Sequence, residues 1–464
     1  MRLYLINPSN PLVSMARVKE NRWNRYRVWK PLSLMVLAGL TPPEWEVRIL
    51  DENLGVPDYD ALPPPDLVGI TAFTSQANRA YAIAAHFRAR GVPVVMGGIH
   101  ATMCLDEVMA RVDSVVTGEG EGVWAQLLAD ARRGALARRY EGGLAAVAEI
   151  PPARHDLLST GYAFGAIQTT RGCPLNCSFC SVTAFNGARY RMRPIADVIA
   201  EFRLVAEKRV LVVDDNLIGT SAAHIARAKA LFRGLIEAKL DKEWIAQATI
   251  NLADDEELMA LAAKAGCRGV FIGFESPSPE GLREVSKKFN LLKDRDFRAS
   301  VRRIQRHGML VVGSFIIGLD VDKPGIGQRI AEAASQYGVD SLNALYLTPL
   351  PGTRLWDQMQ VEDRIALNAF PNDWQYYTLN FPVARYKHLS LDAINAEMLA
   401  CDRAFYSLPR IVSRVWDSFW RRRQPLISLV GNLSYRKNHE LSTEAYVAFR
   451  RYMAAAHACP ERSG

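Results

Sequence analysis

The stretch TTRGCPLNCSFCSVTAF, residues 169–185, holds three of the seven cysteines of this 464-residue chain within eight positions. Its first residues end an apolar run, FGAIQTT (164–170), that has the composition of a buried strand. The N-terminus MRLYLINPSNP predicts a strand and a turn rather than a secretory leader, so we expect a reducing, cytoplasmic location. Clustered thiols in that setting are more often metal ligands than disulfide partners. The stretch therefore predicts a metal-binding loop at the end of a strand.

Two kinds of metal group suit Cys173, Cys177 and Cys180. A structural zinc ion needs four Cys or His ligands, and the fourth would have to come from a distant part of the chain. A [4Fe–4S] cluster held by three cysteines instead leaves one iron open to a small molecule. Gly172 permits a tight turn, and Pro174 stiffens the loop. We favour the cluster with an open iron.

The segment CPLNCSFC, residues 173–180, resembles the C-x-x-x-C-x-aromatic-C signature of the radical S-adenosylmethionine (SAM) enzymes. This resemblance covers roughly residues 160–355 and implies an open iron that binds SAM, whose reductive cleavage releases a 5′-deoxyadenosyl radical. It also implies a flavodoxin- or ferredoxin-type reductant. Arg191 and Arg193 are candidate countercharges to the cluster or to SAM. The resemblance assigns SAM contacts to Phe179, before the third cysteine, and to the strand-end residues Asp214, Asp215, Asn216, Glu275, Gly313, Ser314 and Pro349.

From about residue 163 the chain alternates apolar strands with helical segments. The predicted strands are FGAIQTT, RVLVVDDN, EWIAQATI, GVFIGFES, LVVGSFIIG and LNALYLTPL. The predicted helical stretches are 195–207, 221–237, 254–265 and 293–307. Six such units predict an open sheet or a partial (β/α)6 barrel with its active site at the C-terminal strand ends. We place the radical SAM core at 160–355.

Residues 1–150 show a similar alternation, with strands at RLYLINP, VRILDEN, LVGITAF, VPVVMGG and DSVVTGEGE. The pattern predicts a Rossmann-like α/β domain, in which a parallel sheet has helices on both faces. Ligands of such sheets bind at the carboxyl ends of the strands. Residues 141–160 contain glycines and a Pro pair and are predicted to form a linker.

Three segments of the first domain resemble the cobalamin-binding domain of B12-dependent radical SAM enzymes: DLVGITAFTSQ (66–76), VVMGGIHAT (94–102) and VVTGEGEGVW (115–124). The motif D-x-H-x-x-G is absent, so we expect no histidine ligand to cobalt. The alternatives are a nucleotide, which the lack of G-x-G-x-x-G after the first strand disfavours, or a bare scaffold. The resemblance assigns cobalamin contacts to Thr71, Ser75, Gly97, Gly98, His100, Gly118 and Glu119.

The two resemblances together imply an enzyme similar to the class B methyltransferases, including those like the hopanoid C-2 methylases. Such an enzyme methylates an unactivated carbon of a small molecule through methylcobalamin and a 5′-deoxyadenosyl radical. One alternative is a cyclase or ring-rearranging enzyme that uses both cofactors without methyl transfer. Another is a corrinoid carrier with a structural cluster. No catalytic acid or base is identified, and the pocket candidates, each equally suited to the core, are Tyr346, Trp356, Trp374, Tyr376 and Tyr377.

The net charge of +8 gathers at 17–30 and 419–426, which predicts a solvated basic face or an anionic membrane contact rather than a nucleic-acid site. No apolar run reaches the ~20 residues of a membrane-spanning helix. We expect a mostly helical region at 356–464. Within it, residues 411–432 place Ile411, Val415, Phe419 and Trp420 near one helical face, followed by Arg421, Arg422 and Arg423. This predicts a core-packed helix or a peripheral membrane segment, and the latter favours a lipid-like substrate over another natural-product intermediate.

Overall fold

The computed structural model describes residues 1–10, 12, 29–158, 161–422 and 425–457, so the basic segment at 17–30 falls mostly outside it. The N-terminal part forms a six-stranded parallel sheet in the order β2-β1-β3-β4-β5-β6. The chain runs from β1 to β2 on one side and then to β3 on the other, and such a reversal opens a ligand crevice at the strand ends. The strands are β1 (Arg2–Asn7), β2 (Glu46–Asp51), β3 (Leu67–Thr71), β4 (Val94–Gly97), β5 (Ser114–Gly118) and β6 (Arg139–Gly143).

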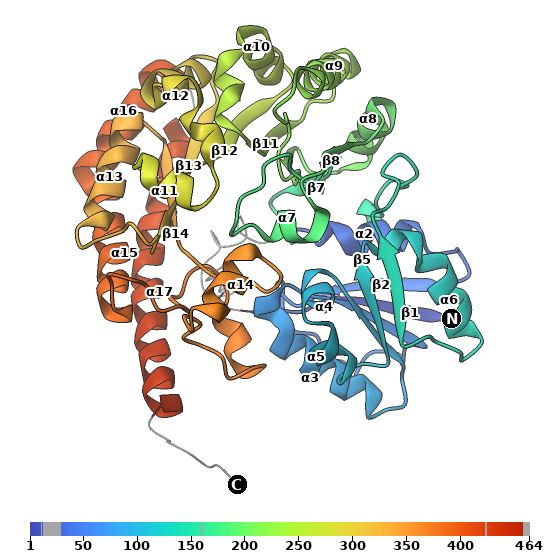
Figure 1. Cartoon of the computed structure of the whole chain (residues 1–464). Helices are drawn as coiled ribbons and strands as arrows, with labels where there is room; N and C mark the ends of the chain where they lie inside the picture. Colours follow the sequence, from blue (N-terminus) through green and yellow to red (C-terminus); the bar gives the residue numbers. More distant parts are fainter. Residues whose placement is uncertain (11, 13–28, 159–160, 423–424, 458–464) are drawn as a thin grey trace.

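Both faces of this first sheet are covered, because successive side chains of a strand point to opposite sides. In β1, Leu3 and Leu5 join one core, and Tyr4 and Ile6 join the other. The predicted Rossmann-like architecture is confirmed (Figure 1). One face is covered by α2 (Leu32–Gly39) and α6 (Trp124–Arg132), and the other by α3 (Ala77–Arg88), α4 (Ile99–Met103) and α5 (Leu105–Met109).

The second sheet has six parallel strands in the simple order β14-β13-β12-β11-β10-β7. Its two edge strands do not pair with each other, so the sheet is an open, partial (β/α)6 barrel, as the sequence predicted. The strands are β7 (Gly165–Ile167), β10 (Arg209–Val212), β11 (Glu243–Ala248), β12 (Cys267–Glu275), β13 (Leu310–Ile317) and β14 (Ser341–Tyr346).

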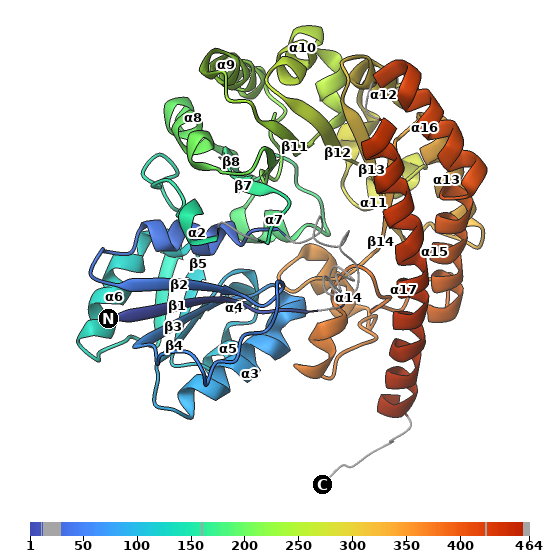
Figure 2. The same cartoon turned by 180° about the vertical axis from the view of Figure 1, so that it is seen from behind.

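The helices of the second unit form an arc on the outer side of this sheet, and the first domain lies across the open part of the arc (Figures 1 and 2). A short antiparallel ribbon, β8 (Thr170–Arg171) with β9 (Arg191–Met192), joins the two ends of the cysteine-containing loop. The helices are α7 (Ser181–Asn186), α8 (Ile195–Leu204), α9 (Ala222–Ala238), α10 (Glu256–Lys264), α11 (Pro279–Glu284), α12 (Phe297–Arg306), α13 (Ile326–Tyr337) and α14 (Arg354–Val361).

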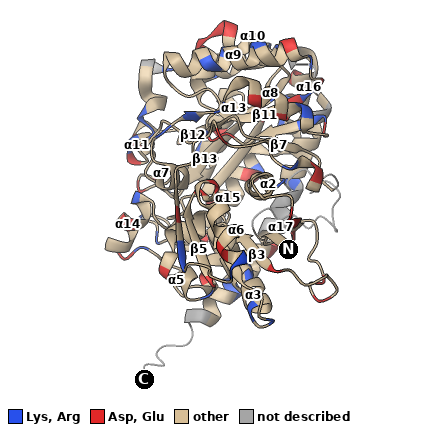
Figure 3. Cartoon of the chain, turned by 90° about the vertical axis from the view of Figure 1, so that its right-hand side faces the viewer, with Lys and Arg blue, Asp and Glu red and all other residues tan. Residues whose placement is uncertain are grey.

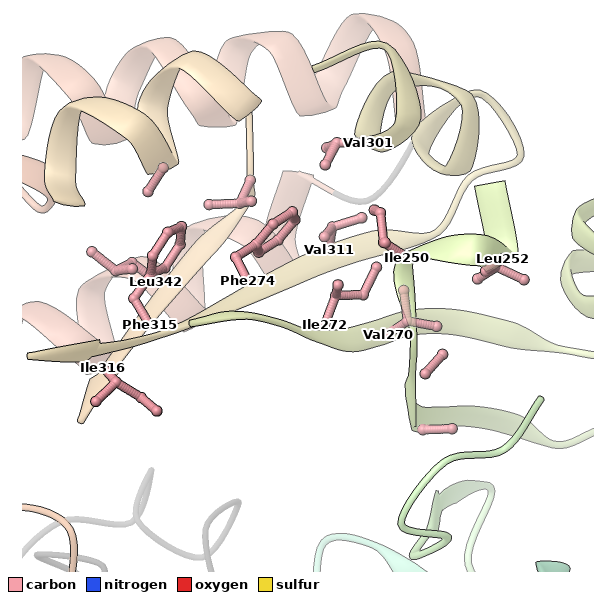
Figure 4. Packing of buried hydrophobic residues seen from close by; sticks show 14 of the residues in the cluster. Ile250, Leu252, Val270, Ile272, Phe274, Val301, Val311, Phe315, Ile316 and Leu342 are labelled. Atoms are coloured by element: carbon pink, nitrogen blue, oxygen red, sulfur yellow. The ribbon is translucent and has the colours of Figure 1, made fainter. Parts of the chain in front are cut away.

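The second core lies between the sheet and the outer helices. Phe274 of β12 and Phe315 of β13 stack with ring centroids 5.5 Å apart, on the side from which Val301 of α12 approaches (Figure 4). Ile316 lies on the other side of the strand. This alternation puts large apolar side chains under the helices and leaves the inner side and the strand ends for a ligand.

The C-terminal region is mostly helical and includes α15 (Leu391–Phe405), α16 (Leu408–Arg422) and α17 (Pro425–His457). It does not fold apart from the rest of the chain. Trp374, Phe381 and, on α17, Phe449 are buried in the same core as Tyr4 and Ile6 of the first sheet. Tyr376 and Tyr377 lie in that core too, so these aromatic candidates for a pocket are core residues.

Charges of both signs are interspersed along the helices visible in Figure 3. Several pairs connect the two halves of the chain, including a buried one between Lys30 and Glu207 at 2.6 Å. Among the described residues, no helix combines the length and the apolarity that crossing a membrane requires.

Candidate functional site

The cysteine loop is fixed by its backbone. Gly172 has φ +83°, and a Cβ there would lie 2.2 Å from the carbonyl oxygen of Arg189, so only glycine fits. Farther along, the Ser178 N–H donates to the Val285 carbonyl at 3.3 Å, and the Ser178 carbonyl accepts from the Leu355 N–H at 3.1 Å. The loop is therefore held between the segments that follow β12 and β14.

The three thiols are free and lie close enough to affect one another electrostatically. Burial raises the pKa of the Cys177 thiol to about 12, Lys287 lowers it, and Cys180 and Cys173 raise it further. Burial likewise raises the pKa of Cys173. Their thiolate forms consequently need nearby positive charge, which iron ions supply. Three free thiols on one strand-end loop have the number and chemistry to ligate a [4Fe–4S] cluster with one iron open.

A buried ion pair lies beside the thiols and was not predicted from the sequence. Lys287 Nζ is 3.0 Å from Glu275 Oε1, and both side chains are almost fully buried. Although burial opposes its charge, Glu275 and the Cys177 and Cys173 thiolates raise the pKa of Lys287. Lys287 is a fixed cation suited to an anionic ligand group next to the cluster.

Local backbone geometry makes room for this pair. Strand β12 shifts register against β13 between Gly273 and Glu275, and Glu275 has φ +65°. A Cβ on Gly273 would lie 2.1 Å from Glu275 Oε1, so a larger residue there would displace this carboxylate from its present position. Lysines are rarely buried, and Lys287 occurs in an ordinary polar segment, SKKF. Only the tertiary contact with Glu275 distinguishes it from Lys288.

Asp214 and Asp215 have different surroundings although they are adjacent. Asp214 is fully buried, and its carboxylate accepts hydrogen bonds from the Thr169 N–H and hydroxyl, both at 2.6 Å, and from the Thr170 hydroxyl at 2.9 Å. These hydrogen bonds hold the start of the cysteine loop, and the contact of Asp214 with SAM stays a prediction. Asp215 accepts from the Gly172 N–H at 2.9 Å, and burial raises its pKa to about 6.

Asn216 points at a cluster cysteine. Its Oδ1 accepts a hydrogen bond from the Gly219 N–H at 3.2 Å, which fixes the orientation of the amide. Its Nδ2 then donates toward Cys173 Sγ at 3.8 Å and toward Thr249 Oγ1 at 3.4 Å. The side chain is 1% exposed. Asn216 thus contacts a cluster ligand, whereas the sequence resemblance had assigned it to SAM.

The other residues assigned to SAM lie at the predicted strand ends with different exposure. Phe179 is half-buried against the second core, and Ser314 of β13 is half-buried as well. Gly313 faces the helices, because a Cβ there would lie 3.2 Å from the Phe274 ring. Pro349 is buried after β14.

A cavity of about 310 Å³ lies between the strand ends of the first sheet and the start of the second unit. Its inner part is apolar and is lined by Leu5, Leu34 and Trp124. The first sheet contributes Thr71, Gly97, Gly98, Gly118 and Glu119, and the second unit contributes Gln168, Arg171, Phe185, Asn186, Val213 and Asp215. We call this space the interdomain cavity.

Glycine backbone shapes the interdomain cavity. Gly98 has φ +93°, and a Cβ there would lie 2.7 Å from Thr71 Oγ1. Gly118 has φ +71°, and its Cβ would lie 2.7 Å from the Gly143 carbonyl oxygen. An apolar recess of this size suits the tail base of cobalamin, and backbone and hydroxyl groups at its rim suit the amide-bearing edges.

Ion pairs hold the two walls of the interdomain cavity together. Arg191 Nη1 donates to Glu119 Oε2 at 2.9 Å, and Arg171 contacts Glu119 at 3.1 Å and Glu121 at 2.5 Å. Burial raises the pKa of Glu119, but Arg191 and Arg171 lower it below its usual value. Arg193, the other predicted countercharge, instead pairs with Glu201 at 2.6 Å.

Two residues assigned to cobalamin lie away from this cavity. Ser75 is buried, and its carbonyl accepts from Asn10 Nδ2 at 2.6 Å. His100 is fully buried, with Nε2 2.8 Å from the Tyr81 hydroxyl and 3.5 Å from Glu107. Helix α4 turns His100 toward the core, and the cobalamin contacts of Ser75 and His100 stay predictions. Although burial opposes it, hydrogen bonds with His100, Tyr81 and Trp374 lower the pKa of Glu107 to about 2.

Comparisons with known proteins agree with both parts of the site. Residues 23–128 match the family model of the B12 binding domain, and residues 167–325 match that of the Radical SAM superfamily. The chain is 30% identical to the bacteriochlorophyllide d C-12(1)-methyltransferase of Chlorobaculum tepidum over 438 residues, which cover 90% of each chain. It is 28% identical to the hopanoid C-2 methylase of Rhodopseudomonas palustris over 72% of this chain and 65% of that one.

A solved structure supports the same fold. It is TsrM from Kitasatospora setae, a radical SAM methyltransferase with cobalamin and a [4Fe–4S] cluster bound. The TM-score is 0.68 at 20% identity, and the match covers 95% of this chain and 99% of that one. The chain therefore belongs to the cobalamin-dependent radical SAM enzymes and is a methyltransferase of that family, with a [4Fe–4S] cluster, SAM and cobalamin as its cofactors.

Proposed function

We propose that this enzyme methylates an unactivated carbon of a largely apolar, polycyclic small molecule. The names of two relatives support this substrate class, since a bacteriochlorophyllide and a hopanoid are both polycyclic and mostly apolar. The reductant is proposed to be a small electron carrier of the flavodoxin or ferredoxin type.

The site residues take the following roles in this proposal. Cys173, Cys177 and Cys180 ligate the cluster, and Lys287, oriented by Glu275, attracts the carboxylate of SAM. Bound together, the cofactors supply a hydrogen-abstracting 5′-deoxyadenosyl radical and a transferable methyl group. The cobalamin contacts are Thr71, Gly97, Gly98, Gly118 and Glu119, all on the interdomain cavity.

The observation that carries the proposal is the shared interdomain cavity. Arg171 and Asp215 belong to the unit that carries the cysteine loop, yet they line the same space as Thr71 and Gly98 of the first sheet. Asp215 also accepts a hydrogen bond from Gly172, directly before Cys173. Groups bound on the two sides would therefore be near each other, as methyl transfer to a substrate radical requires.

The test uses the reconstituted holoenzyme, SAM with a trideuterated methyl group, a chemical reductant, and either a hopanoid or bacteriochlorophyllide d as substrate. We expect S-adenosylhomocysteine and 5′-deoxyadenosine to form in parallel, with a product heavier by the labelled methyl group. Formation of 5′-deoxyadenosine with a changed but unlabelled product would overturn methyl transfer in favour of the cyclase alternative. Labelled product only from polar compounds in a control panel would overturn the substrate class.

A further inference from the structure

Helix α16 exposes an apolar stripe to the outside of the molecule. The five side chains Leu408, Val412, Trp416, Phe419 and Trp420 are each 54–66% exposed. At about 100° per residue they lie on one continuous face of the helix. The Trp416 ring centroid is 6.4 Å from that of Phe419 and 5.8 Å from that of Trp420. Helix α16 runs along the outer edge of the molecule in both views (Figures 1 and 2).

The side of α16 that faces the protein carries polar residues beside apolar ones. Ser418 is fully buried, and the Arg414 guanidinium lies 4.0 Å from the centroid of the Phe405 ring. Arg414 Nη2 also donates to Asn432 Oδ1 of α17 at 2.7 Å, and burial lowers the pKa of Arg414 to about 10. A helix at a water-facing surface normally has polar residues on its exposed side and apolar residues on the side that faces the protein.

This arrangement corrects the predicted face of the helix. Ile411 is 2% exposed and Val415 packs against the second core, whereas Phe419 and Trp420 point outward. At about 100° per residue, the nine residue steps from Ile411 to Trp420 turn by about 900°, which places the two side chains on opposite sides of the helix. The side chains of Arg421 and Arg422, and Arg423 as a whole, lie outside the described part.

We propose that the α16 stripe docks on the surface of a lipid bilayer. The stripe spans 13 residues, or about 20 Å of helix, and a continuous exposed apolar face of this length suits a helix that lies in the interface plane. Tryptophan is the residue most characteristic of that interface. Ser418 of α16 and Ser428 and Asn432 of α17 are buried while the apolar stripe is exposed, and such small or polar residues on the inner side of a helix pair resemble helix packing next to lipid. The sequence after the stripe, RRR, complements anionic headgroups.

A second copy of the chain is a less suitable occupant. The exposed area of the five side chains is roughly 600 Å², and a standard interface of about 800 Å² per partner would need a polar rim beside it, for which no complementary surface is seen among the described residues of α16. The exposed apolar area is nonetheless at the upper end of the contiguous apolar patches found on monomers. A membrane surface has no minimum area of this kind, because affinity rises continuously with buried apolar area and with charge.

The test is co-sedimentation of the full-length holoenzyme with phosphatidylcholine vesicles that contain or lack phosphatidylglycerol. We expect the wild type to bind, more strongly with the anionic lipid, and to lose that gain in high salt. The combined variant Trp416→Ser, Phe419→Ser, Trp420→Ser should bind at least tenfold more weakly. The matched control is Val56→Ser, Leu204→Ser, Val361→Ser, which removes three similarly exposed apolar side chains elsewhere and should bind like the wild type.

SAM cleavage by each variant, measured with the chemical reductant, shows whether the protein is folded, and it should be unchanged. Equal vesicle binding by the wild type and the α16 variant would overturn the proposal. So would a wild type that binds no vesicle but forms a dimer that the α16 variant dissociates, since the stripe would then be an interface between copies. Both results are independent of the substrate proposed above.

Discussion

The cysteine loop and the interdomain cavity are built in opposite ways. The loop concentrates its chemistry in side chains within eight consecutive positions, from Cys173 to Cys180. The cavity draws on several strand ends, and the backbone of Gly97, Gly98 and Gly118 shapes much of its rim. A site of the first kind fails when a side chain is removed, whereas one of the second kind fails when a side chain is added. The two halves of this active site should therefore respond to different substitutions.

The largest effect is expected from replacing Cys173, Cys177 or Cys180 singly with Ala. Each variant should lose the cluster and all detectable SAM cleavage, because three ligands leave no spare thiolate. Cobalamin binding should be unchanged, since the contacts proposed for it lie on the other side of the cavity. Iron content, 5′-deoxyadenosine and cobalamin absorbance measure these properties, with Cys104→Ala as the control. A cysteine variant that keeps its iron and cleaves SAM would refute the assignment.

The next largest effect concerns Lys287. Changing it to Met leaves Glu275 buried without a countercharge, which should lower the free energy of unfolding by about 3–5 kcal/mol. Adding Glu275→Gln should restore most of this loss. Urea denaturation of the apo protein measures both. If the double variant has the same free energy of unfolding as Lys287→Met alone, the loss does not come from an unpaired charge on Glu275.

The cavity should be sensitive to an added methyl group at Gly98. Gly98→Ala forces a positive φ on a residue with a Cβ and crowds Thr71, so cobalamin affinity should fall about tenfold while the iron content stays the same. Gly134→Ala is the control, because Gly134 has φ +66° but open space around it. That variant should lose about 1 kcal/mol of stability and no cobalamin affinity. Equal affinities in the two variants would contradict a backbone-built cavity.

Two carboxylates on the interdomain cavity should respond oppositely to pH. Burial raises the pKa of Asp215 from 3.8 to about 6, so its protonated form stabilises the fold below about pH 4, and this contribution is lost as pH rises through 6. Asp215→Asn should therefore stabilise the apo protein at pH 7.5 by roughly 1–3 kcal/mol and have little effect near pH 4. The pKa of Glu119 is lowered, so its charged form stabilises the fold. Glu119→Gln should therefore destabilise the apo protein at pH 7.5 and have a smaller effect at low pH. Urea denaturation at both pH values measures this, and a pH-independent effect of Asp215→Asn would contradict it.

The smallest effect is expected at Asn216, which donates toward Cys173 Sγ. Asn216→Leu removes a hydrogen bond that stabilises the more negative, reduced cluster, so its midpoint potential should become more negative. A threefold lower reduced fraction at a fixed potential corresponds to a shift of about 30 mV. Redox titration followed by electron paramagnetic resonance measures it. Thr249→Val, which removes only the other acceptor of this amide, should leave the potential unchanged.

Sequence patterns were sufficient where the signal is local. Both parallel sheets follow from apolar runs that alternate with helices, except for the edge strand β6 (Arg139–Gly143), whose residues 141–143 were predicted to be linker. The cysteine loop is one contiguous motif. Sequence patterns were insufficient where the role of a residue depends on the direction in which its side chain points. His100 stands in a glycine-rich strand-end segment like Gly97 and Gly98, yet the short helix α4 turns its side chain to Tyr81. No pattern in the sequence predicts the orientation of this short helix.

Tertiary pairing accounts for the other differences. Asp214 has the chemistry of a SAM ligand, but its carboxylate accepts hydrogen bonds from the hydroxyls of Thr169 and Thr170. Lys287 has the composition of a surface residue, but Glu275 allows its burial. In each case the partner is far away in the sequence, so the role of the residue is decided only by the fold.

The core of the first sheet has a consequence for how the chain is synthesised. One face of that sheet, with Tyr4 and Ile6, is completed by Phe381 and Phe449 from the C-terminal region. On the ribosome, about 300 residues separate the end of β6 from Phe449, which at roughly 5–20 residues per second takes about 15–60 s. During that interval the part of this core that Phe381 and Phe449 cover in the complete protein stays exposed. Chaperone binding during translation, and poor yield of any version truncated before α17, are the expected results.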